Sequence, residues 1–113
     1  MLSRLTLAAV LTPIVLTLAS VAAAAEYEVT SKTGQGEMYF EPEVLRIAPG
    51  DTVRFTVAHT GVGHDAASIR GMIPEGAEPF MGEPDEELSI TFTVPGVYGI
   101  KCGPHYSAYG MVG

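Results

Sequence analysis

Residues 101–111 read KCGPHYSAYGM, and the fold has to place the donor side chains of this stretch correctly. It contains the only cysteine of the chain, Cys102, together with His105 and Met111. A thiolate and a thioether are soft donors that suit copper(I), and imidazole binds copper readily. A strand-like run at residues 96–101 leads into this stretch. We therefore expect a strand to end next to the candidate metal-binding loop.

Residues 101–111 supply three of the four donors of a known metal site. Two histidines, one cysteine and a weak axial methionine define the blue-copper electron-transfer site. The best upstream candidate for the second histidine is His64, in the sequence GVGHD at residues 61–65. His64, Cys102, His105 and Met111 are therefore the candidates for one copper site.

Zinc sites and nucleophilic pairs also combine cysteine with histidine, but the sequence favours them less. Structural zinc sites usually use two Cys-x-x-His pairs or further cysteines, and the chain has only one cysteine. A nucleophilic Cys–His pair usually has its partners far apart in sequence, with a third group that orients them. A buried, inert cysteine is the simplest alternative. His59 lies close to His64 in sequence, and we expect it to be a surface imidazole that does not bind metal.

The first 25 residues have the pattern of a signal peptide. A basic residue precedes an apolar run at residues 5–18, and three alanines at 23–25 fit a cleavage site. The alternative is a retained membrane anchor, but Pro13 interrupts the run and small residues follow it. We expect removal before Glu26 and export to the periplasm or the outside, which leaves one domain at residues 26–113.

Charge and cysteine content exclude several classes of protein. The chain has 13 acidic residues against 6 lysines and arginines, a net charge of −7. A nucleic-acid-binding surface needs clustered Lys and Arg, so we expect no such partner. The balance suits a soluble domain that meets its partners transiently. One cysteine cannot form a disulfide within the chain. In an oxidising compartment its thiol would therefore be open to oxidation unless another group binds the sulfur.

Short runs with period-two alternation predict an all-β domain. In Thr52–Val57, for example, Val53, Phe55 and Val57 fall on one face of an expected half-buried antiparallel strand. Residues 66–70 fit either an edge strand or a turn of helix. Many short strands separated by turns predict a Greek-key β-sandwich or barrel. The expected strands are 27–30, 38–40, 44–47, 52–57, 88–94 and 97–102, with a turn at 32–36.

Four segments carry a family resemblance: APGDTVRFTV (48–57), GHDAASIRGMIPEGAEPF (63–80), TFTVPGVYGIKCGPHY (91–106) and GMVG (110–113). Together they resemble the pseudoazurins, which are periplasmic cupredoxins. The resemblance implies a cupredoxin-like β-sandwich with one type 1 copper at one end. By motif match it implies that the four copper ligands are His64, Cys102, His105 and Met111. Chains of that family usually continue past this loop, so we expect the C-terminal part of the domain to be missing here.

The chain departs from the family at two positions near the expected site. Five residues, Tyr106–Gly110, separate the second histidine from the methionine, where pseudoazurins generally have four. Asp65 stands where the family usually carries an asparagine. Pseudoazurins also typically surround the exposed edge of the second histidine with lysines, whereas this chain has only Lys32 and Lys101.

The expected function is the shuttling of single electrons by a periplasmic type 1 copper protein. The resemblance implies transient redox partners, such as a copper nitrite reductase or cytochromes, and we expect a monomer that is free of the membrane once the leader is removed. A copper(I) carrier or chaperone is the alternative, because it uses the same soft donors. We expect no enzyme activity, since the His-Cys-His string typical of multicopper enzymes is absent: Cys102 lies between Lys101 and Gly103.

Overall fold

A computed structural model describes residues 6–16 and 23–113. The predicted signal peptide lies partly outside these residues, and its assignment stays a prediction. Residues 6–16 form no helix or strand, and their apolar side chains are exposed. Within the described ranges, no helix is long and apolar enough to cross a membrane.

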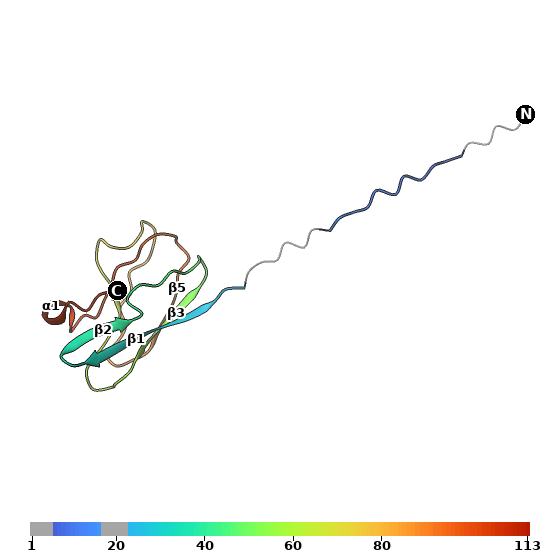
Figure 1. Ribbon diagram of the computed structural model, residues 1–113. Coiled ribbons are helices and arrows are strands. Elements are labelled where there is room, and N and C mark those ends of the chain that lie inside the picture. The colour runs from blue at the N-terminus through green and yellow to red at the C-terminus, as the bar shows by residue number, and fades with distance from the viewer. Residues whose placement is uncertain (1–5, 17–22) are drawn as a thin grey trace, which may run out of the picture.

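The larger of the two sheets in the described residues has four strands in the order β2-β1-β3-β5 (Figure 1). β1 and β2 form an antiparallel hairpin that pairs Thr33 with Met38. β3 runs antiparallel to β5, as predicted, but its other neighbour, β1, is parallel to it, which the prediction of an antiparallel strand did not include. The bounds of these strands are Glu26–Gly34 for β1, Glu37–Glu41 for β2, Thr52–Val57 for β3 and Leu88–Thr91 for β5.

The second sheet is short and is extended by residues 112 and 113. β4 (Ala67–Ser68) pairs with β6 (Ile100–Lys101) in antiparallel register, so residues 66–70 contain a strand and not a helical turn. Val112 forms a bridge with Lys101, and Ile100 and Gly113 exchange two backbone hydrogen bonds of 2.8 Å. We call this pairing of residues 100–101 with 112–113 the terminal ladder. A single helical turn, α1 (Tyr106–Tyr109), completes the regular structure of the described residues. The predicted all-β fold is confirmed.

The core lies under the inward face of the larger sheet and continues into the metal-binding loops. Period-two alternation places Val53 and Phe55 inside as predicted, because successive side chains of a strand point to opposite faces. Cys102 and Met111 belong to the same buried cluster. The site is therefore part of the core, whose buried residues are Val29, Phe40, Val53, Phe55, Ala66, Phe92, Ile100, Cys102 and Met111.

Several predicted strand limits were wrong. Residues 44–47 are not in a strand: Leu45 and Ile47 pack against the core, while Val44 projects into solvent. Prolines at 42 and 49 flank this run, and proline offers no N–H to a ladder. Conversely, β1 extends through the expected turn as far as Gly34, and the turn is confined to Gln35 and Gly36. The strands expected at 88–94 and 97–102 shorten to β5 and β6.

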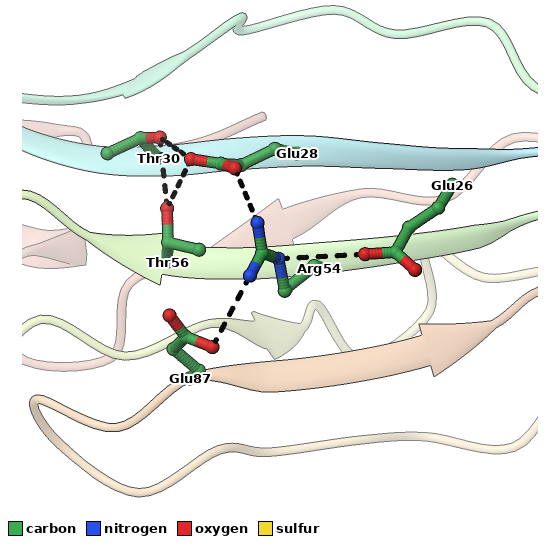
Figure 2. A network of polar contacts seen from close by, with 6 residues as sticks. All are labelled: Glu26, Glu28, Thr30, Arg54, Thr56 and Glu87. Atoms are coloured by element: carbon green, nitrogen blue, oxygen red, sulfur yellow. Dashed lines mark hydrogen bonds and ion pairs between the residues drawn. The ribbon is translucent and has the colours of Figure 1, made fainter.

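The outward face of the larger sheet carries a polar network centred on Arg54 (Figure 2). Its guanidinium lies 2.8 Å from a carboxylate oxygen of Glu28, 3.6 Å from one of Glu26 and 3.9 Å from one of Glu87. The hydroxyl of Thr56 donates to Glu28, and together with Arg54 it holds the pKa of that carboxyl below its usual value. The charged groups of the network are solvent-exposed, so their ion pairs contribute modestly to stability. Its main effect is to link β1, β3 and the start of β5 across the sheet.

An apolar hollow of about 690 Å³ opens on one flank of the core. Its floor includes buried side chains such as Phe40 and Phe55. The rim carries Val44 and Val97, whose side chains are 83% and 86% exposed. Gly113, at the end of the terminal ladder, also lines the hollow.

Candidate metal centre

Three donor side chains meet at one end of the β-fold, and each comes from a loop that follows a strand. His64 lies between β3 and β4, Cys102 follows β6, and His105 immediately precedes α1. His64 and Cys102 are fully buried, and His105 is 9% exposed. Residues about 40 positions apart in the sequence are thus brought into one water-excluded cluster.

The three donor atoms form a compact triangle. Cys102 Sγ lies 3.2 Å from Nδ1 of His105 and 3.7 Å from Nδ1 of His64, and the two Nδ1 atoms are 3.1 Å apart. A point equally distant from the three atoms lies about 2 Å from each, and metal–nitrogen and metal–sulfur bonds in zinc sites are about 2.0 and 2.3 Å long. A single metal ion therefore fits between these donors. Together, a thiolate and two imidazoles match the equatorial donors of a trigonal copper site.

The loop between His105 and Met111 is held by a chain of backbone hydrogen bonds. His105 N–H donates to Cys102 O over 3.2 Å, and Cys102 N–H donates to Met111 O over 3.2 Å. α1 lies within this loop and closes at Gly110 with φ of 63°. Glycine adopts this left-handed conformation without steric cost.

Met111 is placed at the same end of the core. Its side chain is 1% exposed, and its backbone contacts both Cys102 and His105 through the hydrogen bonds of the loop. These contacts leave the axial ligand role of Met111 a prediction. His59, by contrast, is exposed and stands outside the cluster of donors.

Asp65 ties the two metal-site loops together. Its backbone N–H points at Cys102 Sγ over 3.4 Å, and its carboxylate accepts a 2.6 Å hydrogen bond from the N–H of Gly103. A Cβ on Gly103 would lie 3.2 Å from the same carboxylate, so the residue after the cysteine has little room for a side chain. Asp65 is therefore a structural link as well as a charge near the site.

Burial governs the protonation of the donors. Loss of solvent raises the pKa of the Cys102 thiol above its usual value, although the N–H groups of Asp65 and His105 partly oppose this shift. Burial, reinforced by the neighbouring His105, lowers the pKa of His64. The site therefore favours a neutral His64, and a bound cation would supply the charge that stabilises the thiolate.

Sequence reasoning missed two residues that support His64. The hydroxyl oxygen of Thr33, on β1, lies 2.8 Å from His64 Nε2. The N–H of Asp85 donates to His64 O over 2.8 Å, and the Asp85 carboxylate accepts from the N–H groups of Gly61 and Gly63. Continued alternation beyond residue 30 could have placed Thr33 on the inward face. No local signal pairs Asp85 with a loop more than 20 residues earlier.

A family model described as copper-binding proteins of the plastocyanin/azurin family matches residues 26–113. The chain belongs to this family. Copper is accordingly its cofactor, as the soft donors of the 101–111 loop predicted, and the donor triangle is consistent with one type 1 copper.

Individual relatives confirm the resemblance to pseudoazurins. The chain is 40% identical to a pseudoazurin of Paracoccus pantotrophus over 92 residues, which cover 81% of this chain and 61% of that protein. The crystal structure of pseudoazurin from Methylobacterium extorquens AM1 is similar with a TM-score of 0.71 and 38% identity, covering 77% of this chain and 70% of that one. A copper-containing nitrite reductase from Thermus scotoductus matches 76% of this chain but only 20% of its own, with a TM-score of 0.55 and 31% identity. The chain spans between half and about three-fifths of the length of the curated pseudoazurins that it matches.

Proposed function

We propose that this protein is a periplasmic type 1 copper protein that passes single electrons between redox partners. In this proposal His64, Cys102 and His105 are the equatorial ligands and Met111 is the axial one. The observation that carries the proposal is the triangle of buried donor atoms, with sides of 3.1 to 3.7 Å. Copper supplies the one-electron redox change, and the protein supplies a geometry that changes little with oxidation state.

The rigidity of the site follows from how its loops are anchored. The N–H of Cys102 is bonded to Met111, directly before the terminal ladder, and Asp65 links the Cys102 loop to the His64 loop. Side chains that are positioned by strands and by further hydrogen bonds hold their geometry better than side chains on free loops. A fixed geometry reduces the rearrangement that accompanies each electron transfer, which suits a shuttle better than a carrier that has to release its metal.

His105 offers the route between copper and a partner. It is the only one of the three clustered donors with any exposed surface, and its ring packs edge-on against Tyr109 at 5.8 Å between centroids. Tyr106 and Tyr109 are 41% and 50% exposed, so an aromatic surface adjoins the histidine. A small apolar surface of this kind suits brief redox encounters.

The proposed partners are redox proteins such as a copper nitrite reductase or a cytochrome, and the protein is proposed to act as a monomer without catalytic activity. Lys101 lies near this surface, with its ammonium 5.2 Å from the centre of the Tyr106 ring. The net charge of −7 favours a partner whose docking face is basic. A basic cytochrome is therefore the better match of the two.

Copper titration of the chain, followed by its absorption spectrum and voltammetry, tests the proposal. We expect one copper(II) per chain, an intense blue thiolate-to-copper band and a reversible one-electron wave. A protein that binds only copper(I) and stays colourless would instead be a carrier. Absence of stoichiometric uptake would overturn both assignments.

A further inference from the structure

Thr33 is an unexpected neighbour of the metal centre. It lies near the end of β1 and points to the same side of the strand as the buried residues Val29 and Ser31, because side chains two positions apart share a face, although Thr33 itself is exposed. This register brings its hydroxyl to 2.8 Å from Nε2 of His64, the ring nitrogen that faces away from Cys102.

The second contact of the Thr33 hydroxyl fixes the direction of this hydrogen bond. Thr33 Oγ1 also lies 3.3 Å from the thioether sulfur of Met38, its cross-strand partner. A thioether has no proton to give and acts only as an acceptor. A hydroxyl has one proton, so both contacts are satisfied together only when Thr33 donates to Met38 and accepts from Nε2–H of His64.

The direction of the bond determines which nitrogen of His64 is available to a metal. A neutral imidazole carries its proton on one nitrogen and a lone pair on the other. With the proton on Nε2, the lone pair is on Nδ1, the atom that lies 3.7 Å from Cys102 Sγ and 3.1 Å from Nδ1 of His105. We propose that Thr33 is a positioning residue that selects this tautomer of His64 and orients its Nδ1 toward the copper. The inference rests on the proposed ligand role of His64.

A hydrogen-bond acceptor behind a metal-bound histidine makes the imidazole a stronger donor, and losing such a partner typically lowers metal affinity by 10- to 100-fold. A stronger nitrogen donor favours copper(II) over copper(I). Removing the hydroxyl should therefore weaken copper(II) binding about tenfold with little effect on copper(I). For a one-electron couple this corresponds to a rise of about 59 mV in the reduction potential.

The test compares three variants. Thr33→Val removes the hydroxyl and keeps the branched shape, whereas Thr33→Ser keeps the hydroxyl. Thr52→Val is the matched control, because it removes a threonine hydroxyl at the start of β3 from a hydrogen bond of the same 2.8 Å length, to Thr91. We expect a raised potential and about tenfold weaker copper(II) binding in Thr33→Val only. The inference fails if Thr33→Val matches Thr52→Val, or if Thr33→Ser behaves like Thr33→Val.

Nitrogen-15 NMR of the imidazoles provides a measurement that needs neither copper nor a folded Thr33→Val variant. In the metal-free protein we expect the proton of His64 on Nε2 and an unprotonated Nδ1. The opposite tautomer would overturn the inference even in a blue, redox-active protein. If the unchanged chain takes up no copper but shows the expected tautomer, the proposed function fails while the hydrogen-bond assignment is supported.

Discussion

The end of the fold that carries His64, Cys102 and His105, which we call the metal end, belongs to the same core as the apolar hollow. The two regions are closed to solvent to very different degrees. At the metal end, His64, Cys102 and Met111 are almost completely buried, and the three segments that carry them are joined by hydrogen bonds. At the hollow, Val44 and Val97 stand more than four-fifths exposed around about 690 Å³ of apolar space. The difference indicates that the site owes its geometry to bonds between loops, and that it does not require a core closed on every side.

The largest effect should come from the thiol at the metal end. Cys102→Ser changes one buried atom, so the metal-free fold should persist, but a hydroxyl cannot replace the soft thiolate donor. We expect complete loss of the blue absorption and of the one-electron wave. His59→Ala is the control, since that histidine is exposed and should leave both signals unchanged. A blue serine variant would remove Cys102 from the proposed ligands.

In the metal-free protein, the two regions should differ in how much their side chains contribute to the free energy of unfolding. Met111→Ala removes a fully buried side chain and should lower the free energy of unfolding by about 2–5 kcal/mol. Val97→Ala removes methyl groups that already face solvent at the hollow, and should change it by less than about 0.5 kcal/mol. Urea unfolding followed by circular dichroism measures both values. Equal losses would show that the rim of the hollow is packed in solution.

The charge of Asp65 should have a smaller effect, which we expect in the reduction potential of the site. Asp65→Asn keeps the oxygen that accepts from Gly103 N–H but removes a negative charge that favours the oxidised ion. Two unit charges about 4 Å apart interact by about 1 kcal/mol in bulk water and by about 4 kcal/mol at the effective dielectric constant of a protein surface, so we expect a higher reduction potential by voltammetry. An unchanged or lower potential would count against this electrostatic role.

The smallest effect should be a pH dependence set by Asp51, which immediately precedes β3. The N–H groups of Ala25 and Ala48, each 2.8 Å from the Asp51 carboxylate, hold its pKa below the usual value of 3.8. A lowered pKa contributes stability that is present above the unfolded value and is lost as pH falls through the folded one. We expect the stability of the metal-free protein to decline below about pH 4, and Asp51→Asn to flatten that decline in acid titrations followed by circular dichroism.

The predicted cleavage before Glu26 sharpens this last experiment. It would remove Ala25, which supplies one of the two donors to Asp51. The chain that starts at Glu26 should therefore show a shallower acid slope than the full chain. An identical slope in the two forms would mean that Ala48 alone sets the pKa of Asp51.

The sequence predicted what depends on local pattern. Donor type and spacing selected His64, Cys102 and His105, which the fold brings together, and alternation identified the inward face of β3. The sequence did not predict the parallel pairing of β1 with β3. The two strands are far apart in the chain, and a contact between them does not change the residue pattern of either strand. Thr33 was missed for the same reason: its role depends on a histidine 31 positions later. Residues 44–47 resembled a strand because apolar packing alone produces the same alternation.

The terminal ladder has a consequence for the Cys102 thiol. Cys102 donates its N–H to Met111, Met111 donates its own to His105, and Gly113 exchanges two hydrogen bonds with Ile100. We therefore expect the burial of the Cys102 thiol to depend on the docking of residues 111–113. A chain that lost these residues would carry an unshielded sulfur, and we expect it to form disulfide-linked dimers.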